Sequence, residues 1–224
     1  MTSPLLLALS LGALASTATT SALADDEPPP AHGPSAPDDQ FPSHHFTLAA
    51  HQPERVQLAV HYGLLQPVLL HGFNAAVDVR WRRLVVTYSH GAGLDVTSTL
   101  SDSEKQAGLT LREPWTTGGG AGVLLIDELW VLADVKVHHF EAEVGAQHAA
   151  YETMTIGGEI GWRYFIWKGF NVAIVGRYWP NVWSSAQGGV KLKSNSGQPF
   201  VHEPAHQGVD GLFANVLVGW AFGL

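Results

Sequence analysis

The chain has 224 residues, a formal net charge of −8 and only 12 lysines and arginines, so its composition argues against a nucleic-acid-binding surface. It contains no cysteine, which excludes disulfides and any metal site or nucleophile built on a thiol. The length fits one domain with a large core or one closed barrel, and no second domain is required.

Residues 1–24 predict a secretory signal peptide. Their apolar stretch, residues 5–15, is too short to cross a bilayer as a helix, which takes about 20 apolar residues. The Ala-Leu-Ala tripeptide ending at Ala24 gives the small-x-small pattern of a cleavage site, although no Lys or Arg precedes the apolar stretch. We therefore expect export and cleavage after Ala24. Residues 25–54, which are acidic and proline-rich at their start, predict a disordered leader.

From residue 55 to residue 224, apolar side chains recur at every second position, which is the period of a β-strand with one apolar face. Trp130 and Leu132 interrupt this alternation, and the glycine-rich stretch 116–126 is the least regular strand. The pattern predicts an all-β domain, an antiparallel up-and-down transmembrane β-barrel of eight strands. These strands are expected at residues 56–64, 73–81, 84–90, 116–126, 129–138, 154–164, 170–178 and 212–224.

The connections between these strands alternate in length. Tight turns are expected at residues 81–83, 127–128 and 167–169. Longer links are expected at residues 66–72, 95–115, 145–150 and 181–210. Short turns on one side and long loops on the other are typical of outer-membrane barrels whose two termini lie in the periplasm.

Aromatic residues are predicted to form two belts on the outer face, one near each end of the barrel, as at the two interfaces of a membrane. The belt near the short turns comprises Trp81, Trp162, Tyr164, Trp167, Trp220 and Phe222. The belt near the long loops comprises Tyr62, Tyr88, Trp115, Tyr151, Tyr178, Trp179 and Trp183.

With this strand pattern, residues 55–224 resemble the small eight-stranded bacterial outer-membrane barrels of the OmpA transmembrane-domain type. The last strand, residues 212–224, is similar to the insertion signal of that family, with Trp220 and Phe222 at alternate positions. It ends in Leu224, where the family usually has Phe or Trp. The resemblance implies a bacterial outer-membrane location, contact with outer-membrane lipid, and recognition by the barrel-insertion machinery through this strand. It also implies a structural, adhesive or recognition role, since only a few members modify lipids.

Seven charged residues fall on the polar face of the predicted strands and are expected to point into the barrel. Three are acidic and four are basic, so they can form a lumen ion-pair network: Asp78, Arg80, Asp134, Lys136, Glu159, Arg163 and Arg177. An eight-stranded barrel is only wide enough for side chains to fill, so this network should plug the lumen. The alternative is a path for protons or ions.

Other candidate sites in the sequence are weaker. The pairs His44–His45 and His138–His139, and His202 and Glu203 with His206, allow a surface zinc or nickel site, but we expect solvated loop histidines. His138 and His139 should point to opposite faces of one strand, so they cannot easily share an ion. The run of glycines at 118–122 is not followed by the Lys-Ser/Thr of a phosphate cradle, and we expect a thin strand wall instead.

No catalytic, cofactor or metal-binding residue is assigned. Ser89, Ser98, His90 and His139 could supply a nucleophile and a base, but no Gly-x-Ser-x-Gly elbow is present. We predict a non-enzymatic outer-membrane barrel whose loops 95–115 and 181–210 meet an external partner or shield the surface. The alternatives are a soluble periplasmic barrel that holds an apolar ligand, as lipocalins do, and an outer-membrane lipid-modifying enzyme.

Overall fold

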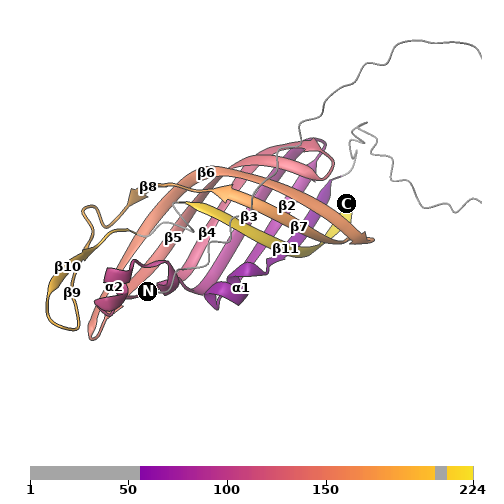
Figure 1. Ribbon diagram of the computed structural model, residues 1–224. Helices are drawn as coiled ribbons and strands as arrows, with labels where there is room; N and C mark the ends of the chain where they lie inside the picture. Colours follow the sequence, from indigo (N-terminus) through magenta and orange to yellow (C-terminus); the bar gives the residue numbers. More distant parts are fainter. Residues whose placement is uncertain (1–55, 205–210, 224) are drawn as a thin grey trace, which may run out of the picture. The chain divides into compact units, whose positions relative to one another are not determined.

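The computed structural model describes residues 56–204 and 211–223. Eight antiparallel strands close into an up-and-down barrel (Figure 1). Each strand pairs with its neighbours along the chain, and pairing between the first and the last strand closes the barrel. The strands are β1 (Gln57–Gly63), β2 (Phe73–Trp81), β3 (Leu84–Asp95), β4 (Thr110–Ile126), β5 (Leu129–Val144), β6 (Gln147–Trp167), β7 (Phe170–Tyr178) and β11 (Leu212–Gly223). The predicted barrel of eight strands is confirmed.

The two faces of each strand follow the predicted alternation. On β2, Asn74, Ala76 and Asp78 are buried inside the barrel, whereas Val77 and Val79 are exposed on the outer face. The other barrel strands also alternate between buried and more exposed residues, because successive side chains on a strand point to opposite faces. The barrel therefore has a mainly apolar outside, and its inside holds the buried polar and charged side chains together with an apolar cluster of Val85, Leu124, Trp130, Leu132, Ala173, Val175 and Leu217.

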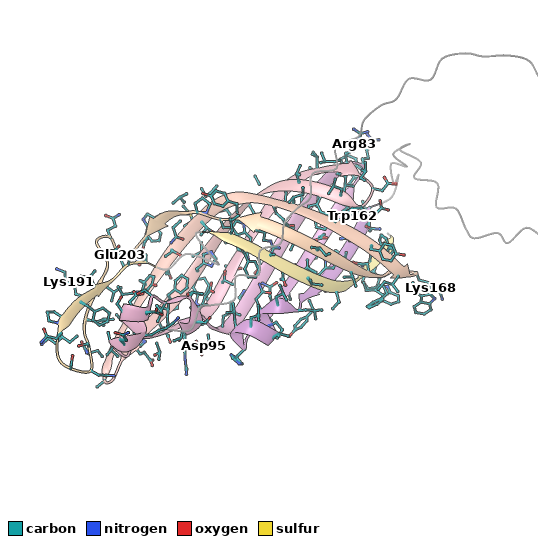
Figure 2. All side chains as sticks on the ribbon, in the orientation of Figure 1. Arg83, Asp95, Trp162, Lys168, Lys191 and Glu203 are labelled. Carbon is teal, nitrogen blue, oxygen red and sulfur yellow. The ribbon has the colours of Figure 1, made fainter. Side chains whose placement is uncertain are left out.

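Three two-residue turns connect strands at one end of the barrel, as predicted: Arg82–Arg83, Asp127–Glu128 and Lys168–Gly169. We call this the short-turn end and the other the long-loop end. Arg82 and Lys168, each the first residue of its turn, have positive φ, as the first central residue of a type I′ or II′ hairpin turn does. Figure 2 places Arg83 and Lys168 at the short-turn end and Lys191 and Glu203 toward the opposite end.

At the long-loop end the strands run further than predicted. The predicted loop 145–150 is wrong: β5 continues to Val144, β6 begins at Gln147, and only Gly145 and Ala146 form the turn. The prediction failed because the polarity of the faces reverses, with Phe140 and Ala142 inside and charged side chains outside. Likewise β4 begins at Thr110 rather than 116, and a shift in strand register between Arg112 and Trp115 hides its alternation.

The other predicted long links also contain regular structure. Residues 66–72 lie mostly in helix α1 (Leu65–Leu70), and residues 95–115 include a short 3-10 helix (Thr97–Thr99) and α2 (Asp102–Gln106). The link 181–210 contains β8 (Asn181–Ser184), which pairs with β6, and a hairpin of β9 (Val190–Lys193) and β10 (Pro199–His202). No helix in the described part of the chain is long and apolar enough to cross a membrane.

A buried apolar cluster joins β3, β4, β5 and β6 to the segment around α2 and to β9 at the long-loop end, where α2 and the β9–β10 hairpin are seen in Figure 1. We call it the cap cluster, and its members are Leu94, Val96, Leu100, Leu109, Leu111, Phe140, Ala142, Val144, Tyr151 and Leu192. The predicted signal peptide and leader, residues 1–54, lie outside the described residues, as do His206 and Leu224.

Candidate functional site

The barrel interior holds the largest concentration of charged groups in the described residues. All seven side chains of the predicted lumen network are buried: Asp78, Arg80, Asp134, Lys136, Glu159, Arg163 and Arg177. Glu113 is an eighth, and it was missed because residues 95–115 were predicted as a loop. With Glu113 the buried interior has four carboxylates facing four Lys and Arg side chains, so these charges balance.

The first layer of this interior, nearer the short turns, is organised around Asp78. The guanidinium of Arg163 on β6 donates a hydrogen bond to Asp78 on β2, and Arg80 Nη2 lies 3.7 Å from the same carboxylate oxygen. His61 Nδ1 lies 3.6 Å from that oxygen, and its Nε2 is 3.0 Å from Asn171 Oδ1. One carboxylate therefore holds three cationic or imidazole groups from different strands.

Trp130 explains why the alternation breaks at the start of β5. Its indole N–H donates to Glu159 Oε1 at 2.8 Å, and the guanidinium carbons of Arg80 and Arg163 lie 4.6 and 5.9 Å from the centre of its ring. The Trp130 ring therefore interacts favourably with the two guanidinium groups, because cations are attracted to the face of an indole. Gly161 on β6 makes room for it, since a Cβ there would collide with the Trp130 ring.

The middle layer contains a second ion pair and a second tryptophan. Arg177 donates to Glu159, and both the Arg177 guanidinium and the Lys136 ammonium lie 4.8 Å from the centre of the Trp179 ring. Trp179 was predicted in the outer belt, and this prediction is wrong because the side chain is buried inside. Trp179 follows β7 in phase with the inward-facing Arg177, and its backbone N–H donates to Gly211 O at 2.7 Å.

The upper layer is formed by Glu113 and His138. His138 Nδ1 lies 2.7 Å from Glu113 Oε1 and 2.9 Å from Thr116 Oγ1, and its Nε2 is 3.0 Å from Thr155 Oγ1. His138 is buried, whereas His139 points outward and stacks on Trp115. The prediction that the two histidines face opposite ways is confirmed.

Above this layer, a chain of hydrogen bonds fixes the β9–β10 hairpin to the barrel. Tyr151 Oη lies 2.9 Å from His202 Nε2, and His202 Nδ1 donates to Glu104 Oε1 on α2 at 2.7 Å. Burial alone would raise the pKa of Glu104, but hydrogen bonds from His202 and Ser101 outweigh it and hold that pKa below its ordinary value. Two predictions are corrected here: Tyr151 is not in the outer belt and His202 is not a solvated histidine, because both are buried.

The other members of the predicted belts lie on the outer face. Tyr164, Trp167 and Trp220 are exposed near the short turns, and Tyr178 and Trp183 are exposed nearer the long loops. The glycines of β4 behave as predicted for a thin wall. A Cβ at Gly118 would collide with Lys136, and one at Gly120 or Gly122 would collide with Leu132.

The residues considered for nucleophilic catalysis are not brought together. Ser89 is buried in the barrel, while His90 is on the opposite face beside Phe73. Ser98 lies in the 3-10 helix, where its carbonyl accepts a hydrogen bond from Lys105.

No protein-family model, curated protein or solved structure matches this chain, so the functional assignment depends on the geometry described above.

Proposed function

We propose that this protein is an outer-membrane β-barrel with a plugged polar lumen, and that its long-loop end serves a structural or surface-recognition role. The observation that carries the proposal is the distribution of polarity, which is the reverse of that in a water-soluble protein. Buried inside are ion pairs such as Arg163–Asp78, whereas large apolar residues such as Ile174, which is 64% exposed, cover the outside. Lipid can surround such an outer face without the free-energy penalty that water would impose.

The outer apolar band also has a defined upper limit. Paired positions on β4, β5 and β6 form a row across the three strands: Trp115, His139 and Glu152. The adjacent row on the outer face, one step closer to the short turns, consists of Thr117, Val137 and Met154. Beyond the limiting row the outer face of β5 carries Glu141 and Glu143. On β5 and β6 the outer positions therefore change from apolar to mainly titratable side chains at this row.

The height of this band supports a membrane fit. On β5 the apolar outer positions run from Leu129 to Val137, which is nine residues and matches the 9–11 residues of a typical transmembrane strand. At ~3.4 Å per residue and a tilt of about 40°, this segment rises roughly 21 Å along the barrel axis. That is close to the apolar band of ~25 Å in outer-membrane barrels.

The interior contacts favour a plugged lumen over a wide pore. Strands β2 and β6 are four positions apart around the barrel of eight, so the Arg163–Asp78 pair bridges its diameter. The cap cluster and the hydrogen-bonded Tyr151, His202 and Glu104 cover the interior at the long-loop end. Small-molecule diffusion through this barrel is therefore not the proposed role.

The lipocalin-like alternative fits the interior less well. A site for an apolar ligand needs an apolar lining, whereas Asp78, Glu113, Lys136 and Arg163 occupy the lumen. Displacing these charged pairs with an apolar molecule would leave them unpaired, at a cost of several kcal/mol.

Cell fractionation with electrophoresis of boiled and unboiled samples tests the proposal. We expect the protein in the outer-membrane fraction, and we expect the unboiled sample to migrate differently because the closed barrel resists detergent. Recovery of folded protein in the soluble periplasmic fraction would support the lipocalin-like alternative instead. A second sample, in which Asp78 and Arg163 are both replaced by Ala, should lose the mobility difference at a lower temperature than the wild type.

A further inference from the structure

Three metal-ligating side chains converge on the outer face of the β5–β6 hairpin, beyond the row Trp115–His139–Glu152. They are Glu141 and Glu143 on β5 and His148 on β6, and one ligand atom of each lies within 4.8 Å of the others. His148 Nε2 is 3.9 Å from Glu141 Oε2. We propose that these three residues form a binding site for a divalent transition-metal ion of the Zn²⁺ class.

Strand register brings the three side chains together. Glu143 and His148 are directly opposite each other in the antiparallel pair, and Glu141 is two residues earlier on the same face. The residue opposite Glu141 is Ala150, whose small side chain leaves space between the two Glu side chains and His148. All three ligands therefore come from regular strands on both sides of a two-residue turn.

The hairpin that carries the site is fixed in place. The Gln147 side chain donates to Lys193 O at 2.7 Å and accepts from Lys193 N at 2.9 Å. On the inner face, Ala142 and Val144 are buried in the cap cluster. A metal site binds more tightly when its ligands are already held near the geometry of the complex. These contacts hold the backbone of the hairpin in place, so they favour metal binding by its three ligand side chains.

The chemistry of the ligand set selects the ion. One imidazole with two carboxylates is suited to Zn²⁺, which binds such atoms at about 2.1 Å in a tetrahedral arrangement. Ligand atoms in that arrangement are roughly 3.4 Å apart, so rotations of the Glu and His side chains close the present separations. Ca²⁺ and Mg²⁺ prefer six or more oxygen ligands and would gain little from His148. The three protein ligands leave one position for water or an external donor.

Arg112 provides an internal test of the electrostatics. It is the paired residue of Glu141 on β4, and on its other side it is paired with Asp95 on β3. A positive charge at this place competes with a metal cation for the carboxylate of Glu141. Removing that charge should therefore raise the affinity of this site for the metal ion. The affinity of a zinc site elsewhere on the chain should not change.

Zinc titration of the purified, detergent-solubilised protein, by calorimetry and by competition with a chromogenic chelator, tests the site. We expect one saturable site, weakened about tenfold or more by His148→Ala, Glu141→Gln or Glu143→Gln, and strengthened by Arg112→Gln. The matched control is the His44→Ala/His45→Ala double variant, which should bind zinc as the wild type does. Co²⁺ should give the intense visible absorption of a tetrahedral complex, and this absorption should disappear in His148→Ala.

The heat-induced mobility shift of each variant checks that it is folded. Absence of saturable binding, or equal binding by the wild type and all three ligand variants, overturns the proposal. Loss of binding only in the His44→Ala/His45→Ala variant also overturns it, since the zinc would then be bound by the leader. None of these results depends on whether the barrel lies in a membrane.

Discussion

Arg163 on β6 and Asp78 on β2 are 85 positions apart in the sequence, yet they are hydrogen-bonded to each other across the inside of the barrel. The two strands are opposite one another in the closed sheet, so the pair connects two walls that share no backbone hydrogen bonds. Arg80 and His61 also approach Asp78, which makes this carboxylate the central acceptor of the interior near the short turns. The stability of the barrel should therefore depend strongly on this pair.

Replacing Arg163 with Ala should destabilise the folded barrel by about 3 kcal/mol, because Asp78 loses its hydrogen-bonded partner while it remains buried. The measurement is the denaturant midpoint of tryptophan fluorescence in lipid vesicles. Arg83→Ala, at an exposed position in a short turn, is the control and should be nearly neutral. The double variant Asp78→Leu/Arg163→Met should be more stable than Arg163→Ala, because it leaves no unpaired charge at this place. The opposite order would show that the unpaired Asp78 is not the cause of the destabilisation.

Two exposed alanines on the outer face give a matched test of the membrane level. Ala133 lies in the middle of the apolar band on β5, and Ala150 lies beyond the row Trp115–His139–Glu152 on β6. Ala133→Lys should cost about 2 to 4 kcal/mol when the protein is folded in lipid vesicles, whereas Ala150→Lys should cost close to none. Equal and small effects of both substitutions would argue for a barrel surrounded by water.

The hairpin of β9 and β10 should loosen in acid. Because the pKa of Glu104 in the folded protein lies below its ordinary value of 4.5, its stabilising contribution is present above that value and is lost as the pH falls through the folded-state pKa. Hydrogen exchange of the backbone amides of residues 190–202, corrected for intrinsic rates, should show less protection at pH 3 than at pH 6. Glu104→Gln should reduce this difference, and Asp127→Asn at the short-turn end should preserve it. An unchanged pH response in Glu104→Gln would contradict the proposed contribution of Glu104.

Protease access tests which end of the barrel faces outward. Lys191 is exposed on the β9–β10 hairpin, whereas Arg83 and Lys168 lie in short turns at the opposite end (Figure 2). Trypsin added to intact cells should cleave after Lys191 or the exposed Lys105 and should spare Arg83 and Lys168. Cleavage at Lys168 in intact cells, with Lys191 spared, would reverse the orientation. Permeabilised cells serve as the control for access to both ends.

The strands within the apolar band could be predicted from the sequence because every second side chain there faces outward and is apolar. This pattern placed β2 and β7 at their observed bounds and assigned Asp78, Glu159 and Arg177 correctly to the interior. Beyond the band the outer positions of β5 are charged and the inner ones apolar, so a search for one constant pattern ended β5 too early and began β6 too late. The register shift between Arg112 and Trp115 hid the strand position of Glu113 and, with it, the charge balance of the lumen.

The sequence by itself determined the number of strands, their alternation and the set of seven charges that face inward, since these follow from a local period of two residues. Only the tertiary structure decided which charges meet. The Arg163–Asp78 pair depends on which strands are opposite in the closed sheet, and the Glu104–His202–Tyr151 chain depends on how a loop folds back onto the barrel. The alternation of β7 already points Trp179 inward, in phase with Arg177, but only the tertiary structure shows that its ring contacts Lys136 on β5. Such contacts join residues across the whole chain, and no local periodicity records them.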